Sequence, residues 1–432
     1  MAQTLIKGAL CKIGKPAFMK SLNNDFKPVL AFSCQNFSSV REKDTNVVKS
    51  VFISQSSDIF TNLALEDWIY RHFDFSNHHV LLLWRNSPCV VVGRHQNPWA
   101  EANVSRLSEA GIPIARRNSG GGTVYHDGGN LNLTFFTPRG RYNRRSNLEL
   151  ICRALNSEFG IRTAVSPRED ILLEGDYKQI SGTAAKLGHP NAYHHCTLLV
   201  NVNMPNLHDS MHKEDDGIHT NATRSLPSPV RNLSEVYSGL TVDHVLGAIG
   251  REFLRSDAAG KNVGNGVVSR RGFQLINPAE SWFPGLEKLR QEMSSWIWRF
   301  GKTPRFDVTR SFTIPRELAV GEAASAEAEK LSKAPAADAS PAQLTVKMEV
   351  VNGRVSDVTI TIPPGFLNAA PNGGEIAVVT DLRGKRFSEE ALRILDESFA
   401  VTDPCGRAGQ PGQGGEKNRF VASCVRKVMQ SV

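Results

Sequence analysis

The chain has 432 residues, of which 40% are hydrophobic and 22% charged, and a formal net charge of +8 at pH 7. This length allows two or three domains, and no run of about 18 apolar residues is present, so the sequence predicts no membrane span. Seven cysteines are scattered without a Cys-x-x-Cys pair, which argues against a disulfide framework or a zinc site and favours a reducing compartment.

The N-terminal segment has the character of a mitochondrial presequence. Residues 1–24 carry four lysines and no acidic residue, interspersed with leucine and isoleucine. This basic amphipathic pattern is typical of such presequences. We therefore expect residues 1–40 to be a presequence that is removed on import into the mitochondrial matrix. The alternative is a basic tail without regular structure.

Regular elements are predicted from residue 58 onward. Apolar residues recur at helical spacing behind Asp58, and the turn signal Asn86-Ser87-Pro88 separates two short apolar runs. The elements predicted up to residue 111 are a helix over 58–70, neighbouring strands over 79–84 and 89–93, and a helix over 103–110.

The stretch from Arg116 to Leu133 places two arginines, three consecutive glycines and a polar strand side by side. Three glycines in a row cost backbone entropy, so a folded chain keeps them where φ is positive or where another group approaches the main chain. Their N–H groups can together form an anion nest. The alternation after the glycines predicts strand, turn and strand. The alternative interpretation is a glycine-rich hairpin turn with solvated arginines.

Further elements follow this stretch. Helices are predicted over about 148–159, 242–253 and 281–300, a strand over 194–201, and hairpins over 170–180 and 344–362, the latter with an Asn-Gly turn. Residues 205–221 are predicted to form a loop. Three histidines there (208, 212, 219) are irregularly spaced, which favours a solvated loop over a metal site.

The C-terminal part is predicted to contain a small domain between two irregular segments. The Ala- and Pro-rich stretch 317–343 predicts a linker, and the Gly-rich stretch 403–418 predicts an unstructured tail. Ser388 is predicted to cap a helix whose first acidic residues, Glu389 and Glu390, suit its N-terminal end. Residues 344–432 are therefore expected to form a small α+β accessory domain.

Four motifs in chain order resemble the lipoate–protein ligase and lipoyltransferase family: Gly93–Trp99, Arg116–Asn132, Ile180–Ala184 and His194–Leu199. Trp296–Trp298, followed by Gly301–Pro304, is similar to the end of the catalytic part of the same family. The best fit is to the mitochondrial members from animals. The resemblance covers residues 50–310 clearly and 344–432 loosely.

The resemblance implies an α/β (α+β) fold. Residues 48–310 would form a single mixed sheet flanked by helices, of the lipoate- and biotin-ligase type, and a small C-terminal α+β domain would follow. The site would hold lipoyl-AMP and pass the acyl group to the ε-amine of a lysine on a lipoyl domain. Because an acyl-phosphate anhydride is already reactive, the protein mainly has to position it and stabilise charge.

The site residues implied by the family's motifs bind the donor. Those implied for lipoyl-AMP are Arg117, Gly121, Gly122, Thr123, Val124, Tyr125, Arg168, Lys178, Thr197 and Thr223. Arg117 and the N–H groups of the glycine stretch would supply charge and donors, and Val124 and Tyr125 would line the nucleotide. His126 and Asn130 are close enough in sequence to line the same pocket. No metal ligand is implied.

The catalytic residue implied by the resemblance is a lysine that touches the lipoyl carbonyl and the phosphate. The family has this lysine, one aliphatic residue and then Ser-Gly, whereas this chain reads Lys178-Gln179-Ile180-Ser181-Gly182. A one-residue slip turns a strand side chain to the other face, so either a bulge restores Lys178 or Gln179 takes its place. We predict Lys178, because an amide does not replace a cation beside a phosphate.

Two further candidates lie in the strand predicted over 194–201. His194 and His195 lie on opposite faces of it, so only one of them can face the ligand, and a packed histidine is an equal alternative for His195. Cys196 is the only cysteine in a site motif. It is a candidate for a covalent intermediate if the donor is an amide, and a buried inert cysteine is the alternative.

The function implied is that of a lipoyltransferase for the lipoyl domains of 2-oxoacid dehydrogenase acyltransferase subunits. The donor would be the lipoylated glycine-cleavage H protein or lipoyl-AMP, and the protein would be a monomer without a nucleic-acid or membrane partner. The alternatives are a lipoate–protein ligase that uses ATP and magnesium, a catalytically weak lipoyl-domain binder, and a nucleic-acid-binding module. The net charge permits the last, but few aromatic residues are interleaved with the cations.

Overall fold

The computed structural model describes residues 47–211, 217–256, 268–319, 341–366, 372–377, 382–388, 391, 393–394 and 413–430. The predictions for the presequence over 1–40, for His212, for most of the linker over 317–343, for Glu389 and Glu390, and for residues 403–412 lie outside the described residues. Within the described ranges no helix is both long and apolar enough to cross a membrane.

The described helices up to residue 319 are Ile59–His72 (α1), Pro98–Glu101 (α2), Val104–Glu109 (α3), Arg144–Phe159 (α4), Met204–Met211 (α5), Val242–Arg255 (α6), Leu286–Ser294 (α7), Trp296–Arg299 (α8) and Arg316–Ala319 (α9). The strands there are Val47–Ser54 (β1), His78–Trp84 (β2), Cys89–Val92 (β3), Ile114–Arg116 (β4), Val124–His126 (β5), Asn130–Pro138 (β6), Thr163–Val165 (β7), Ile171–Leu173 (β8), Ser181–Leu187 (β9), Asn191–Leu199 (β10), Ile218–Thr220 (β11), Val268–Ile276 (β12) and Phe306–Thr313 (β13). Beyond residue 340 follow Gln343–Val351 (β14), Arg354–Ile362 (β15), Gly374–Ala377 (β16) and Gln413–Gln430 (α12).

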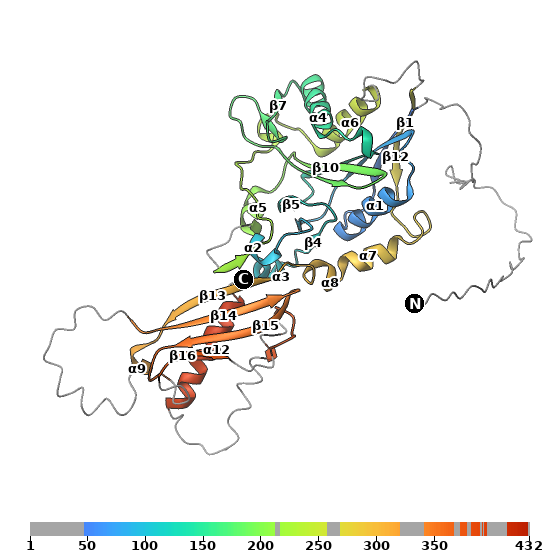
Figure 1. The fold of residues 1–432 in the computed structure, drawn as a ribbon. Coiled ribbons are helices and arrows are strands. Elements are labelled where there is room, and N and C mark those ends of the chain that lie inside the picture. The colour runs from blue at the N-terminus through green and yellow to red at the C-terminus, as the bar shows by residue number, and fades with distance from the viewer. Residues whose placement is uncertain are drawn as a thin grey trace, which may run out of the picture. The chain divides into compact units, whose positions relative to one another are not determined.

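A six-stranded mixed sheet in the order β12-β1-β2-β6-β10-β9 forms the centre of the N-terminal part of the described chain. β1 pairs in parallel with β12 and β2, and the remaining pairs are antiparallel. α4 and α6 cover one face, and α1 and α7 cover the other (Figure 1). The prediction of a helix over 58–70 is confirmed, because Asp58 caps α1 by accepting the N–H of Thr61 at 2.9 Å.

A second, three-stranded sheet in the order β4-β3-β5 carries the central glycine stretch. The prediction of a single sheet is therefore wrong, as is the prediction that β2 and β3 are neighbours. Asn86 explains the separation, because its side chain accepts from Asn62 and donates to His126, and these contacts hold the turn between the two sheets. The predicted strand, turn and strand after the glycines is confirmed, but β5 and β6 belong to different sheets.

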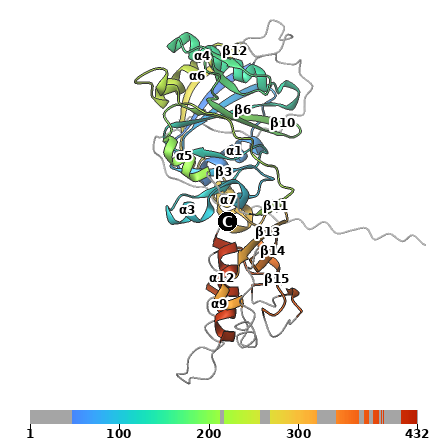
Figure 2. The same cartoon turned by 90° about the vertical axis from the view of Figure 1, so that its left-hand side faces the viewer.

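The C-terminal part is a five-stranded sheet in the order β11-β13-β14-β15-β16, with α12 against one face (Figure 2). Residues of β14 alternate between buried and more exposed, as the period of a strand requires. The hairpin predicted over 344–362 is confirmed, and both turn residues, Asn352 and Gly353, have positive φ. Apolar residues of the three-stranded sheet, such as Val90, share one hydrophobic core with this sheet and α12.

Helix boundaries differ from prediction where polar side chains cap the chain. α4 begins at Arg144 instead of 148, because Asn143 caps it. Residues predicted as a loop form α5, because Asn203 accepts the N–H of Asn206 at 3.0 Å. The helix predicted over 281–300 is divided at Ser295, whose hydroxyl caps α8.

The hairpin predicted over 170–180 is confirmed, with its turn at residues 174–176. Leu173 N–H donates to the carbonyl of Lys178 and Ile180 N–H to that of Ile171, each at 3.0 Å, and β8 also pairs with β7 on its other side. One further prediction fails for reasons of tertiary packing. Residues 413–418, predicted to be unstructured, form the first turns of α12. The apolar face of this helix, which includes Val425 and Val428, packs on the C-terminal sheet and offsets the cost of two glycines.

Candidate active site

The glycine loop, residues 117–123, connects β4 to β5 and runs along the end of the three-stranded sheet. Arg117 is buried, and its guanidinium turns into the loop. Nε donates to Ser119 Oγ at 3.0 Å, and Nη2 donates to the carbonyls of Gly120 at 2.6 Å and Gly122 at 2.7 Å. Burial lowers the pKa of Arg117 to about 10, so it remains charged at neutral pH.

Arg117 determines which way the loop's peptide groups point. In a planar trans peptide, the C=O and the following N–H point in opposite directions. Because the carbonyls of Gly120 and Gly122 face Arg117, the N–H groups of Gly121 and Thr123 face away from it. Arg117 therefore lies behind the outward N–H groups, and its own donors are used within the protein.

Glycine is required at one position in the loop, Gly121, and at one position that packs against it, Gly93. Gly121 has a φ of 86°, and a Cβ there would lie 3.0 Å from the guanidinium of Arg117. Gly93 lies against it, since a Cβ on Gly93 would fall 2.2 Å from the carbonyl oxygen of Gly121. The Gly93–Trp99 motif is thus a support on which the glycine loop packs.

The segment around Ser225 crosses the other side of the loop. Thr123 N–H donates to Ser225 Oγ at 2.8 Å, and Ser225 Oγ donates to the carboxylate of Glu101. Gln96 joins this cluster by accepting the hydroxyl of Thr123 at 2.8 Å. Thr223, two residues before Ser225, donates its N–H to the carbonyl of His95 at 3.3 Å. The structure therefore brings the predicted residues Thr123 and Thr223 together.

Strands β9 and β10 form the opposite wall. Thr197 Oγ1 accepts the N–H of Gly182 at 2.9 Å, and a Cβ on Gly182 would lie 3.4 Å from Val124. Gly121 meets the same strand, because its added Cβ would lie 3.3 Å from that of Ala184. Three predicted site residues, Gly121, Val124 and Thr197, therefore pack against strand β9 close to one another.

Two buried polar atoms in this region have no hydrogen-bond partner among the described residues. They are Nε2 of His126 and Oδ1 of Asn130. Asn86 donates to Nδ1 of His126 at 2.9 Å, which leaves Nε2 as the unpaired N–H. Buried polar groups are almost always satisfied, so these two atoms are available to hydrogen-bond a ligand or a water.

The buried His126 makes stability dependent on pH. Burial, followed by the charges of Arg117 and His195, lowers the pKa of His126 from its usual 6.5 to about 3. The unfolded chain therefore binds a proton that the folded chain excludes. We expect this contribution to stability to be complete above about pH 6.5 and to be lost, by about 1.4 kcal/mol per pH unit, as the pH falls from there toward 3.

Urea unfolding at pH 7 and pH 5 measures this dependence. His126→Gln is expected to flatten the decrease in stability between the two pH values, whereas His219→Gln, at an exposed position, is expected to leave it as in the unmodified chain. An equal decrease in the His126→Gln and unmodified chains would contradict the assignment.

Lys178 and Gln179 differ in burial. Lys178 is exposed, and its backbone N–H donates to Asp176. Gln179 is half-buried, and its amide donates to Asp170 at 3.3 Å and to the carbonyl of Ser181. The pairing of β9 with β10 is regular from Ser181 onward, so no bulge within β9 moves Lys178 into register. Gln179 therefore has the family's spacing before Ser-Gly.

Two residues of the predicted lipoyl-AMP set lie away from this site. Tyr125 is buried in the core shared with the C-terminal sheet, because consecutive residues of β5 face opposite sides and Val124 takes the side of the site. This corrects the prediction that Val124 and Tyr125 form one wall. Arg168 is exposed in the turn between β7 and β8. Burial raises the pKa of nearby Asp170, and the charge of Arg168 offsets only part of that rise.

The residues of β10 alternate between the two faces of the sheet. His195 faces the glycine loop, whereas His194 stacks on Phe135 beneath α4 at 5.9 Å between ring centroids. Cys196 also faces the α4 side, is buried, and has its thiol pKa raised by burial. A nucleophilic cysteine has to form a thiolate, so the candidacy of Cys196 fails.

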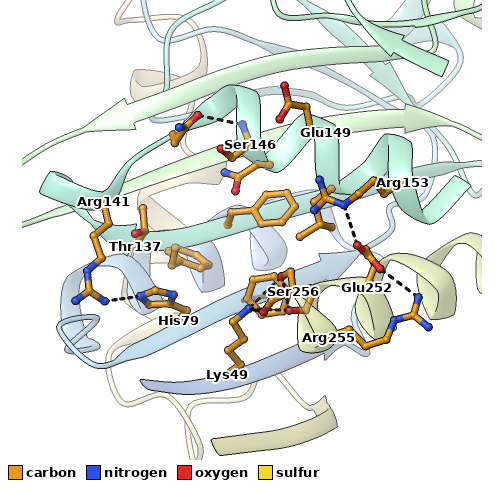
Figure 3. A pocket seen from close by; sticks show the side chains of 16 residues that line it. Lys49, His79, Thr137, Arg141, Ser146, Glu149, Arg153, Glu252, Arg255 and Ser256 are labelled. Atoms are coloured by element: carbon orange, nitrogen blue, oxygen red, sulfur yellow. Dashed lines mark hydrogen bonds and ion pairs between the residues drawn. The ribbon is translucent and has the colours of Figure 1, made fainter. Parts of the chain in front are cut away.

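A cavity of about 460 Å³ lies on the α4 and α6 side of the six-stranded sheet (Figure 3). Its charges are largely compensated: Arg153 and Arg255 pair with Glu252, and Lys49 donates to the carbonyl of Phe253. Because the sheet separates it from the glycine loop, it is not part of this site. In the described residues no cluster of His, Cys, Asp or Glu could hold a metal ion.

Sequence reasoning missed several residues that shape the loop. Gln96, Glu101 and Ser225 support it from separate segments, and Glu66 of α1 reaches it through His195. One signal was available for Glu66, since the apolar helix pattern places it on the buried side, where an ionised group requires a partner. No pattern in the local sequence indicated that Ser225 contacts the loop.

The sequence is similar to proteins of known family. Residues 58–254 match the family described as Lipoyl protein ligase A/B catalytic domain. The chain is 43% identical over 316 residues to the mitochondrial lipoyl amidotransferase LIPT1 of Mus musculus, covering 73% of this chain and 76% of the mouse protein. It is 40% identical over 361 residues to its Homo sapiens counterpart, covering 83% of this chain and 87% of the human protein.

Among solved structures, the P. falciparum protein LipL1 in complex with lipoate is 21% identical and superposes with a TM-score of 0.49, covering 89% of this chain and 100% of that chain. The family is shown by the two mammalian relatives, each matched at 40% identity or more over more than two thirds of its length. The chain belongs to the lipoyl protein ligase A/B catalytic domain family.

Proposed function

We propose that this protein is an acyltransferase that moves a lipoyl group onto the acceptor lysine of lipoyl domains. The observation that carries the proposal is the glycine loop, in which the Gly121 N–H points away from Arg117 and Gly121 packs against Thr183 and Ala184 of β9. Outward N–H groups backed by a buried cation suit a phosphate and a developing oxyanion, the two charges that an acyl adenylate presents. The identity to the two lipoyl amidotransferases supports the lipoyl group as the acyl group.

In this proposal lipoyl-AMP binds between the glycine loop and strands β9 and β10. Gly121, Gly122 and Thr123 contribute backbone donors, and Val124 and Thr197 line the acyl chain. The N–H of Thr123, which now donates to Ser225, becomes available if the donor's phosphate displaces that hydroxyl. Asn130 and His126 offer their unpaired polar atoms to the same ligand.

The proposal extends to partners and location. The acceptors are lipoyl domains of 2-oxoacid dehydrogenase acyltransferase subunits, and the donor is the lipoylated glycine-cleavage H protein or lipoyl-AMP. The two mammalian relatives are mitochondrial, which supports a mitochondrial protein, and the basic residues 1–40 support import into the matrix. We propose that residues 48–310 carry catalysis, that residues 344–432 form an accessory part, and that the protein is a monomer.

A donor comparison tests the proposal. The chain lacking residues 1–40 is incubated with apo lipoyl domain and, in parallel, with lipoyl-AMP, with lipoate plus ATP and magnesium, or with lipoylated H protein, and the mass of the acceptor is measured. We expect transfer from lipoyl-AMP or from H protein but not from free lipoate. Transfer from lipoate and ATP would favour the ligase alternative, and no transfer from any donor would contradict the enzymatic function.

The position of Gln179 favours one second candidate, a catalytically weak lipoyl-domain binder. An amide now has the spacing at which the family has its lysine, and an amide cannot supply a positive charge to the phosphate. Binding of apo lipoyl domain without transfer from any of the three donors would support this candidate.

Substitution of Lys178 and of Gln179 shows which of the two side chains contacts the donor. If Lys178 reaches the donor, Lys178→Met is expected to lower kcat/KM for lipoyl-AMP by about a hundredfold, since it removes a charge beside the reacting group, whereas Gln179→Met leaves it within a few-fold. Transfer rates from lipoyl-AMP measure both variants. An unchanged rate in Lys178→Met, together with an increase in Gln179→Lys, would contradict the assignment of Lys178.

A further inference from the structure

A chain of buried hydrogen bonds runs from α1 to the glycine loop. Glu66 Oε1 lies 2.9 Å from His195 Nδ1, and His195 Nε2 lies 2.7 Å from Ser119 Oγ. Ser119 Oγ in turn accepts from Nε of Arg117 at 3.0 Å. The exposed fractions are 1% for Glu66, 8% for His195 and 1% for Ser119. Four residues from α1, β10 and the loop itself are thus joined in one line.

Two of the three hydrogen bonds in this chain have a determined direction. The guanidinium of Arg117 only donates, so Ser119 Oγ accepts from it, and the same oxygen lies within hydrogen-bond distance of His195 Nε2. Burial opposes ionisation of Glu66, but the attraction of His195 and hydrogen bonds from His195 and Thr134 outweigh it and hold the pKa of this carboxyl below its usual value. The carboxylate therefore accepts the Nδ1–H of His195.

We propose that Glu66 and His195 are positioning residues of the glycine loop. Through Ser119 they fix the orientation of the Arg117 guanidinium, which holds the carbonyls of Gly120 and Gly122 inward and keeps the intervening N–H directed at the donor. The inference rests on the proposed function for the identity of that donor. The hydrogen-bond chain itself is a property of the folded protein and can be tested without catalysis.

The same three side chains have the order of a serine nucleophile, its base and an orienting carboxylate. Two observations favour positioning over attack. Ser119 is buried to the same degree as the carboxylate, and its oxygen already accepts from Arg117 and lies 2.7 Å from His195 Nε2. An attacking oxygen has to leave both contacts and reach a solvent-accessible carbonyl, whereas a positioning oxygen stays where it is.

Hydrogen exchange of the loop amides tests the proposal without any substrate. The peptide containing residues 117–123 is followed in the unmodified chain and in Glu66→Gln, His195→Gln and Ser119→Ala. Each change breaks or weakens one link and leaves a buried partner poorly satisfied, so exchange is expected to accelerate about tenfold to a hundredfold. The matched control is His194→Gln, which removes an equally buried imidazole from the other face of β10.

Equal exchange of the loop in all four variants and the unmodified chain would overturn the proposal. Acceleration in His194→Gln as large as in His195→Gln would also overturn it, because that result would reflect a general loosening of the strand. Acceleration in the three variants together with an inactive unmodified chain would contradict the proposed function and leave the positioning role intact.

Kinetics with lipoyl-AMP add a readout that general destabilisation does not move. Glu66→Gln and Ser119→Ala are each expected to lower kcat about tenfold to a hundredfold with KM for the acceptor domain unchanged. The double variant is expected to lose little more than either one, because the two residues act through the same imidazole. Ser119→Thr keeps the hydroxyl and is expected to restore most of kcat. Losses of kcat that multiply in the double variant, or no recovery of kcat in Ser119→Thr, would contradict the proposal that Glu66 and Ser119 act through His195.

Discussion

Replacing Arg117 by lysine is expected to lower kcat/KM for lipoyl transfer by about a hundredfold or more. The planar guanidinium contacts Ser119 and the carbonyls of Val91, Gly120 and Gly122 at once. A lysine ammonium supplies positive charge but cannot reach acceptors on both sides of the loop from one point. The loop carbonyls then lose their common partner, and the N–H groups on the opposite side lose their alignment.

Transfer from lipoyl-AMP to apo lipoyl domain, followed by the mass of the acceptor, measures this effect. Arg94→Lys is the matched control, since the side chain of Arg94 is exposed and donates to the loop only through one long contact to Asn118 at 3.4 Å, while its backbone N–H contact to Ser119 is kept in the variant. The control is expected to remain within a few-fold of the unmodified chain. Wild-type kcat/KM in Arg117→Lys would mean that charge alone, without the fork of donors, is sufficient.

Replacing Arg116 by methionine is expected to destabilise the fold by roughly 3–5 kcal/mol, because it removes one buried partner and leaves several others unsatisfied. The Arg116 side chain is fully buried and donates to five backbone carbonyls and to the hydroxyl of Thr303. Two of those carbonyls, of Trp298 and Arg299, belong to α8, and three belong to the segment from Gly93 to Gln96. Methionine fills much of the volume but donates to none of them.

The urea concentration at the unfolding midpoint, with the yield of soluble protein, measures this loss. Arg106→Met is the control, because the ion pair of Arg106 with Asp209 is exposed on both sides and such pairs contribute at most about 1 kcal/mol. An unfolding midpoint in Arg116→Met equal to that of the unmodified chain would show that the carbonyls find other donors.

Arg116 and Arg117 illustrate how far the sequence leads. The pair beside three glycines predicts an anion-binding loop, and the structure has a loop at residues 117–123 between β4 and β5. The sequence gives both residues the same chemistry, yet each has a different role in the fold. Arg116 joins the start of the loop to α8 and to the Gly93–Trp99 motif, whereas Arg117 organises the loop's own peptide groups. Adjacent strand residues face opposite sides, and only the surrounding elements determine what lies on each side.

The same limit applies to β10 and to the segments around it. Alternation correctly predicted that His194 and His195 lie on opposite faces of the strand, but not which of them faces the glycine loop. The partner of His195 is Glu66, 129 residues away in sequence, and the acceptor for Thr123 N–H is Ser225, 102 residues away. No local pattern encodes such contacts, because they form only when separate elements pack together.

By itself the sequence determined the family, the glycine loop, the boundaries of α1 and the Asn-Gly hairpin, since each depends on neighbouring residues or on an ordered set of motifs. The tertiary structure decided the division into two sheets in the catalytic part, the helix over Gln413–Gln430 and the removal of Tyr125 and Cys196 from the site. These outcomes depend on burial of apolar faces and pairing of polar groups between distant segments, and the free energy of such contacts exceeds local preference.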